Sequence, residues 1–380
     1  MRSLPEIPVF AGLVFGLFLM IYPEWFGLPP HGATKIDHAT QPPFYIFPLV
    51  FIAILWSALR ASEHAEAVAI KLPDPFGTLV LTLSAVFIEV ALVIGVMMTG
   101  SAADTVARDT MFATLMLIMN GLVGLSLIAG ALRKREQPFN AQSSSSYLGV
   151  TAALCTIGLV LPRFTTSEPG GYMSARMNFF VAGGSLIVYS AFIFLQSSSH
   201  RDFFVLTRQD AQSHVSHSDL KNQPLWKSIC FLIVTLLSVV LLSESLGDLL
   251  VGFLDRNALA PALQGVVIAF LVLLPEGIAA VRSALRSDVQ RSINILHGSA
   301  LSTIGLTIPA VLFVAMLFGK RVELGLEPPE ICILAATMIL SMLHFGAGKT
   351  NMMQGIVHAM LFVMWIALLI DPPNFLPAVP

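Results

Sequence analysis

Long apolar runs with very few charges recur along the whole chain, and short segments rich in Pro, Gly and charged residues separate them. A transmembrane helix needs about 20 mainly apolar residues to cross the hydrocarbon core of a bilayer. The pattern therefore predicts an all-α polytopic membrane protein, with one transporter domain over residues 1–380 and eleven transmembrane helices. The predicted spans are 8–28, 44–70, 75–99, 104–131, 146–162, 176–197, 225–253, 261–286, 289–318, 329–347 and 352–370.

Composition supports the membrane class and excludes others. Only 12% of the residues are charged and 56% are hydrophobic, whereas soluble domains carry about 25% charged residues. The lipid bilayer is thus the expected partner, and a formal net charge of −2 offers no basic surface for nucleic acid. No small-residue cleavage site follows the first apolar run, so we interpret 8–28 as an extra first helix.

The longest polar interruption, 198–224, divides the chain into two predicted five-helix halves, 44–197 and 225–370. Positively charged loops stay in the cytoplasm. With a cytoplasmic amino terminus, fourteen Lys and Arg residues fall inside and seven outside. The inside set is Arg2, Arg60, Lys71, Arg133, Lys134, Arg135, Arg201, Arg208, Lys221, Lys227, Arg282, Arg286, Arg291 and Lys349, and the outside set is Lys35, Arg108, Arg163, Arg176, Arg256, Lys320 and Arg321. The linker is then cytoplasmic and the carboxyl terminus external.

Five is an odd number, so the two halves are expected to cross the membrane with opposite topologies, as in inverted-repeat transporters. Matching spans of the two halves share a feature. Glu89 follows Gly77 by twelve residues, and Glu276 follows Gly265 by eleven. At about 1.5 Å of rise per residue, each carboxylate lies about 17 Å into its helix, near the middle of the membrane.

Glu89 and Glu276 are the strongest candidates for chemistry. A carboxylate at this depth costs about 2.5 to 3.5 kcal/mol on insertion scales, so it normally faces a cavity or a partner. Two such groups meeting at the interface of the halves could bind a cation that prefers oxygen ligands, such as calcium, and protons would compete for the same oxygens. The alternative is a structural role, with each glutamate bonded to a neighbouring helix.

Neighbouring residues could supply further oxygens. Pro275 lacks an N–H group and frees the backbone carbonyl of Leu271 beside Glu276. The other candidate ligands or pathway residues are Thr82, Ser84, Asn120, Asn294, Ser299, Ser302 and Thr303. Each one alone also fits a role in helix packing, and only the set favours a polar pathway. The linker histidines, His200, His214 and His217, could bind a metal or sense pH, or could belong to a solvated loop.

Three functions fit these features. The leading hypothesis is a secondary antiporter that exchanges a cation for protons. A cation channel is also compatible with paired carboxylates, and so is an intramembrane enzyme in which either glutamate acts on a lipid or a peptide. No nucleophile with an adjacent base and no metal triad is evident, so we expect neither an enzyme nor a cofactor beyond the transported ions.

Several ordered motifs resemble one known family. They are His64–Ala69, Asp74–Ser84, Glu89–Val90, Arg108–Thr110, Gly121–Gly124, Pro275–Gly277, Val289–Asn294, Gly298–Thr303, Leu306–Pro309, and Gly348–Asn351 with His358. From about Arg60 onward the chain is similar to the bacterial calcium/proton antiporters of the ChaA type, which belong to the calcium/cation antiporter superfamily and are also associated with sodium and potassium export.

The resemblance implies one extra helix plus two inverted five-helix repeats in the cell inner membrane. It also implies export of calcium, sodium or potassium in exchange for protons, with Glu89 and Glu276 as the two acidic site residues. The wider family has Asn three residues before each acid, where this chain has Val86 and Leu273. A monovalent cation/proton antiporter with little calcium activity is therefore the alternative. Related members carry an acidic run in the linker that this chain lacks, which weakens any expectation of calcium sensing there.

Overall fold

The computed structural model describes residues 7–26, 28, 45–73, 76–99, 104–168, 170–197, 224–257 and 259–370, and this part of the chain is almost entirely helical. The first half contains α1 (Ile7–Ile21), η1 (Pro23–Phe26), α2 (Ile46–Ala69), α3 (Phe76–Thr99), α4 (Val106–Met116), η2 (Leu117–Leu122), α5 (Val123–Ala131), β1 (Glu136–Pro138), α6 (Ala141–Cys155), η3 (Thr156–Val160), η4 (Leu161–Phe164) and α7 (Ala175–Ser197). The second half contains α10 (Leu225–Arg256), α11 (Leu263–Leu285), α12 (Val289–Ser302), η6 (Thr303–Thr307), α13 (Ile308–Leu317), α14 (Pro328–Gly346), β2 (Lys349–Asn351) and α15 (Met352–Ile370).

Within the described residues, ten helical segments are long and apolar enough to cross a membrane. Their ends lie within about five residues of the predicted ones, and three of them are continuous runs that include the π-helical turns η2, η3 and η6. The first predicted span, 8–28, is shorter in the structure, because α1 ends at Ile21 just before Pro23. The predicted linker lies outside the described residues except for Pro224.

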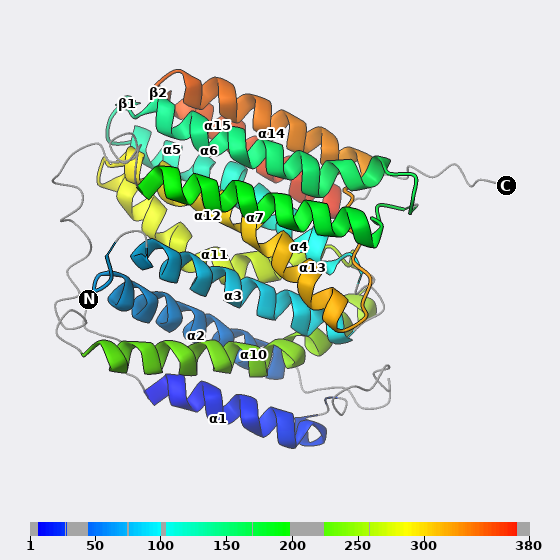
Figure 1. Cartoon of the computed structure of the whole chain (residues 1–380). Helices are drawn as coiled ribbons and strands as arrows, with labels where there is room; N and C mark the ends of the chain where they lie inside the picture. The colour runs from blue at the N-terminus through cyan, green and yellow to red at the C-terminus, as the bar shows by residue number, and fades with distance from the viewer. Residues whose placement is uncertain are drawn as a thin grey trace.

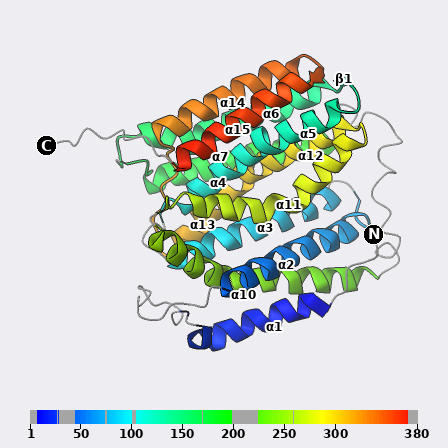
Figure 2. The ribbon, with the colours of Figure 1, turned by 180° about the vertical axis from the view of Figure 1, so that it is seen from behind.

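The helices run roughly side by side through one bundle (Figure 1). Helix α1 lies at one edge against α10, while α14 and α15 lie at the opposite edge, and the view from behind agrees (Figure 2). Helix α10 packs on α2 and α3, and α11 packs on α4. The colours of Figure 1 show that α3 and α11, the helices that carry the two glutamates, run in opposite directions.

Small residues allow the two halves to approach closely. A Cβ atom placed on Gly124 of α5 would lie 2.7 Å from the backbone nitrogen of Ala359 in α15, and one on Gly265 of α11 would lie 2.5 Å from the carbonyl carbon of Asp109 in α4. Membrane helices commonly associate through such glycines. The short strands β1 and β2 pair antiparallel and form a further link between the halves.

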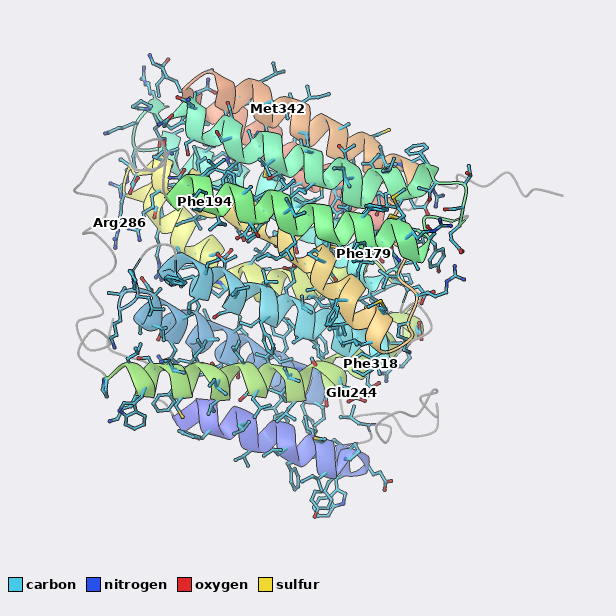
Figure 3. The ribbon with its side chains drawn as sticks, in the orientation of Figure 1. Phe179, Phe194, Glu244, Arg286, Phe318 and Met342 are labelled. Carbon is cyan, nitrogen blue, oxygen red and sulfur yellow. The ribbon has the colours of Figure 1, made fainter. Side chains whose placement is uncertain are left out.

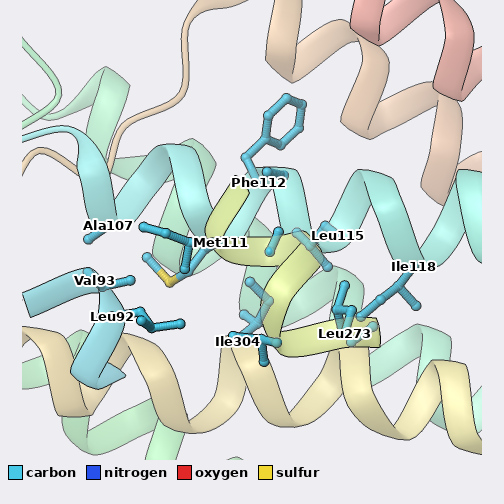
Figure 4. Close-up of a cluster of buried hydrophobic side chains, with 14 of the residues drawn as sticks. Leu92, Val93, Ala107, Met111, Phe112, Leu115, Ile118, Leu273 and Ile304 are labelled. Atoms are coloured by element: carbon cyan, nitrogen blue, oxygen red, sulfur yellow. The ribbon is translucent and has the colours of Figure 1, made fainter. Parts of the chain in front are cut away.

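Apolar side chains fill the centre of the bundle and also cover its outside. The buried cluster of Figure 4 joins residues of both halves, among them Leu92, Met111, Leu273 and Ile304. Large apolar side chains also point outward, as Phe179 does in Figure 3, with 76% of its surface exposed. Apolar groups on both the inner and the outer surface are expected of a bundle whose solvent is lipid.

Polar contacts also join the halves at the end of the bundle where α4 begins. The Arg108 guanidinium donates to Asp109 at 2.9 Å and to Glu323 at 2.7 Å, and it also contacts the Gly325 carbonyl at 3.2 Å. Glu323 lies in the loop before α14, outside the helices that cross the membrane, and its burial raises the pKa of its carboxyl. These bonds fix the start of α4 to the loop between α13 and α14.

Candidate functional site

Glu89 lies in the second half of α3 and is almost completely buried, with 1% of its surface exposed. One carboxylate oxygen, Oε2, accepts hydrogen bonds from the Thr307 hydroxyl at 2.9 Å and from the Thr303 hydroxyl at 3.2 Å. The other oxygen, Oε1, is buried and has no hydrogen-bond partner within the described part of the chain. A buried anionic oxygen without a partner is costly, and a proton or a cation at this atom would remove that cost.

Glu276 lies in α11, directly after Pro275, and its side chain is partly buried. The Ser299 hydroxyl of α12 donates a hydrogen bond to its Oε2. Helix α11 continues through Pro275 without a break, so this segment is not an interrupted helix. Leu271, whose carbonyl the proline leaves without its usual donor, is fully buried.

One helix face therefore contacts both carboxylates. Ser299 bonds Glu276, and Thr303, four residues later, bonds Glu89. Four residues make about one helical turn, or about 6 Å of rise. The structure thus brings together the two glutamates that the sequence predicts on different halves, and α12 with η6 bridges them.

The π-helical turn η6 places the threonines. Pro309 has no N–H group to donate to the Gly305 carbonyl four residues earlier, and a local π adjustment is one way in which membrane helices accommodate a proline. The widened turn carries Thr303 at its start and Thr307 at its end, and both hydroxyls point to Glu89. The sequence thus gives a local reason for an irregular helix at the site.

Two other predicted residues bond within their own helices. The Ser84 hydroxyl donates to the Val80 carbonyl at 2.7 Å, and the Ser302 hydroxyl donates to the Ser299 carbonyl at 2.9 Å. Such bonds to the preceding turn are typical of serine in membrane helices. The structure gives neither hydroxyl a hydrogen bond to the carboxylates.

Three further predicted residues have partners elsewhere. Thr82 faces the hydroxyl of Tyr189 in α7. The Asn294 side-chain oxygen accepts from Gln290 at 2.8 Å, near the start of α12. Asn120, in η2, donates to the Thr337 hydroxyl of α14 at 2.8 Å, and its oxygen lies 3.1 Å from Nδ1 of His358. Asn294 also accepts from the Ser143 hydroxyl of α6 at 3.4 Å. Among the described residues, these side chains make polar contacts between helices, and none of these contacts is with either glutamate.

Two threonines near Glu89 are absent from the predicted set. Thr307 makes the shorter of the two bonds to the carboxylate. Thr114 of α4 lies beside Glu89, and its buried hydroxyl has no partner of normal hydrogen-bond geometry. A spacing of four residues through Ser299, Thr303 and Thr307 marks one helix face, and this signal could have added Thr307 to the candidates.

The site provides two carboxylates and several hydroxyls as possible oxygen ligands. No group of three or more His, Cys, Asp or Glu residues suited to a metal ion occurs among the residues that the structure describes. Val86 and Leu273, three residues before the glutamates, are buried apolar side chains and add no oxygen. A transported cation would therefore rely on the carboxylates, neutral hydroxyl or carbonyl oxygens, and water.

The bundle defines a multi-pass membrane protein with two carboxylates close together between its two structural halves. The family model for the sodium/calcium exchanger protein matches the chain twice, over residues 43–198 and 227–370. The chain belongs to this family. Each match covers one of the five-helix halves, so both carry the same family signature.

Named relatives and solved structures agree with this assignment. The chain is 35% identical to the putative ionic transporter y4hA of Sinorhizobium fredii, over 88% of this chain and 92% of the relative. It is 33% identical to the sodium-potassium/proton antiporter ChaA of Escherichia coli, over 84% and 87%. Its fold is similar to that of native YfkE, with a TM-score of 0.71 at 15% identity over 96% and 99% of the two chains, and to that of the H+/Ca2+ exchanger CAX, with a TM-score of 0.68 at 14% identity over 95% and 88%.

Proposed function

We propose that this protein is a secondary active cation/proton antiporter in which the cation and protons compete for Glu89 and Glu276. The observation that carries the proposal is the single face of α12 and η6, where Ser299 bonds one glutamate and Thr303 bonds the other. A buried carboxylate oxygen without a partner must be neutralised by a proton or coordinated by a cation. Exclusive occupancy by one or the other couples the two fluxes.

The halves are proposed to be inverted repeats that expose this site alternately to the two sides of the membrane. The opposite directions of α3 and α11 and the match of one family model to each half support this topology. The proposed membrane is the cell inner membrane, and the excess of Lys and Arg supports a cytoplasmic amino terminus and a cytoplasmic linker, 198–224. The carboxyl terminus is then periplasmic.

The proposed cargo is calcium, with sodium and potassium as further substrates. A second candidate is a monovalent antiporter with little calcium activity. The apolar side chains of Val86 and Leu273 favour the second candidate, because they leave few side-chain oxygens for the six to eight ligands that calcium prefers. The name of the Escherichia coli relative, a sodium-potassium/proton antiporter, points the same way.

Everted membrane vesicles test the proposal. An acid interior is established, calcium, sodium or potassium is added separately, and dissipation of the proton gradient is followed with a pH-sensitive dye. We expect Glu89→Gln and Glu276→Gln to slow exchange by at least about tenfold, because each removes a charged ligand and a proton site. Ser84→Ala is the matched control, since Ser84 bonds only its own helix.

Wild-type rates in both glutamate variants would show that the site is elsewhere. A channel is distinguished in proteoliposomes, where its cation flux would not respond to an imposed pH gradient. The relative exchange rates with calcium, sodium and potassium in the vesicle assay distinguish the calcium antiporter from the monovalent antiporter.

A further inference from the structure

A pocket of about 700 Å³ lies where α5 ends and α15 begins, far along the chain from either glutamate. Its lining combines two cationic side chains with apolar ones. The residues are Ala131, Leu132, Arg133, Arg135, Asn351, Met352 and Met353. The antiparallel pairing of Glu136 with Asn351 holds the two sides of the pocket together. The pocket therefore joins the first half of the molecule to the second.

The charge in this pocket is not balanced by the protein. Arg133 and Arg135 are exposed, and their guanidinium groups have no carboxylate partner among the residues that the structure describes. The neighbouring acid, Glu136, contacts Lys349 at 3.6 Å. The pocket is thus suited to an anion, and arginine is the residue that best matches the oxygens of a phosphate group.

Exposed apolar stripes lead away from the pocket along both helices. On α15, Met353 is 67% exposed, and Ile356, Met360 and Met364 follow it at helical spacing with 47%, 56% and 47% of their surfaces exposed. On α5, the exposed Leu125 lies seven residues, or two turns, before Leu132. A free inorganic anion would make no use of these stripes, whereas acyl chains would lie along them.

We propose that this pocket binds an anionic phospholipid, with its phosphate between Arg133 and Arg135 and its acyl chains along α5 and α15. Basic pockets between membrane helices at the end that carries most of the positive charge are suited to anionic headgroups. The bound lipid would span α5 and α15, which cross closely at Gly124, and would strengthen the contact between the halves. This inference does not depend on which cation is transported.

Native mass spectrometry of the full-length protein, purified in mild detergent, tests the proposal. The protein is mixed with phosphatidylglycerol or phosphatidylcholine, and the fraction that retains lipid is measured. We expect preferential retention of phosphatidylglycerol, and a fall of at least about tenfold in R133Q/R135Q, because two charge-assisted donors are lost. R133K/R135K keeps the charge and should retain an intermediate amount.

Lys227→Gln combined with Arg286→Gln is the control, since both side chains are exposed and line no part of the pocket. Helix α10, which carries Lys227 near its start, begins at the end of the bundle that holds β1 and β2, and Arg286 lies at that end too (Figure 1 and Figure 3). Wild-type retention in this control supports a specific site. Equal loss in the control, unchanged retention in R133Q/R135Q, or complete displacement of the lipid by excess inorganic phosphate would overturn the proposal. If R133Q/R135Q unfolds at a lower temperature than the wild type, the test relies on R133K/R135K instead. Intermediate lipid retention in R133K/R135K then supports the proposal, and unchanged retention contradicts it.

Discussion

The two halves place a π-helical turn at corresponding positions in their third long helix, and the two turns have different roles. Turn η2 separates α4 from α5, and η6 separates α12 from α13. Both supply polar side chains that bond the other half of the molecule. From η6, Thr303 and Thr307 bond Glu89 of the first half. From η2, Asn120 bonds Thr337 of the second half and does not bond a carboxylate.

Beyond Thr337, the η2 contacts lead to a pair of histidines. The Asn120 oxygen lies 3.1 Å from Nδ1 of His358, and Nε2 of His358 lies 3.2 Å from Nδ1 of His344. Asn120 and His358 are fully buried. Ser299, Thr303 and Thr307, by contrast, lie in one segment of the second half, and each of them donates a hydrogen bond to Glu89 or Glu276. Two corresponding turns therefore have different hydrogen-bond partners, since η6 bonds Glu89 of the candidate site and η2 bonds a network of neutral side chains.

The largest change in the rate of cation exchange is expected from replacing Thr303 and Thr307 of η6 with valine, which keeps the shape of each side chain and removes its hydroxyl. T303V/T307V deprives Glu89 of both hydrogen-bond donors. A hydrogen bond to a charged group contributes about 1.5 to 3 kcal/mol, so exchange should slow by about tenfold or more. The vesicle assay measures the rate and the half-saturating cation concentration.

The matched variant on the other network is Thr337→Val. Thr337 is fully buried and accepts the Asn120 bond without contacting either glutamate. Exchange at close to the wild-type rate is expected. If Thr337→Val slowed exchange as much as the η6 variant did, the distinction between the two turns would be lost.

A smaller effect on transport, together with a clear loss of stability, is expected for Asn120→Leu. This change removes the bonds to Thr337 and His358 and leaves a buried imidazole nitrogen without its partner. Hydrogen bonds between membrane helices contribute about 0.6 to 1.7 kcal/mol each, so the free energy of unfolding should fall by roughly 1 to 3 kcal/mol. Thermal unfolding in detergent measures this, while the half-saturating cation concentration should not change. A shifted cation affinity at unchanged stability would instead assign Asn120 to the site.

Much of the fold follows from the sequence, because a bilayer permits few spanning structures. Apolar length alone gives the ten long spans to within about five residues. Helical rise predicts where Glu89 and Glu276 lie along their helices, and Ser299 and Thr303, four residues apart, bond the two carboxylates. The depth of both glutamates in the membrane stays a prediction. The short first helix is the main difference, since apolar length does not show that α1 ends at Ile21 before Pro23.

The sequence does not predict which polar side chains bond the glutamates and which bond other helices. Thr307 and Asn120 are both polar residues in apolar helices, and nothing in their local composition separates a site residue from a structural one. A π turn also inserts an extra residue, which rotates all later side chains by about 100° relative to regular α-helical spacing. Pro309 is a local sequence signal for the π turn η6, but no proline lies in or just after η2. Side-chain direction beyond each turn therefore requires the three-dimensional structure.

The smallest predicted effect concerns the ion pairs between the halves outside the membrane. Burial raises the pKa of the Glu323 carboxyl above its ordinary value of 4.5, although Arg108 opposes the shift. The folded protein then holds this proton more tightly than the unfolded chain does. The contribution to stability is greatest at low pH and declines as pH rises from 4.5 through the raised pKa.

Thermal unfolding of the wild type and of Glu323→Gln at a series of pH values isolates this contribution. Glutamine cannot titrate, so the variant should lack this part of the decline in unfolding temperature with rising pH, a difference of about 2 °C or less. The same slope in both proteins would mean that Glu323 titrates alike in the folded and unfolded states. Cation exchange should be unaffected, because Glu323 bonds Arg108 at the start of α4 and makes no hydrogen bond or ion pair to either π turn within the described part of the chain. A change in exchange with pH that followed Glu323 would link this outer contact between the halves to the site at η6.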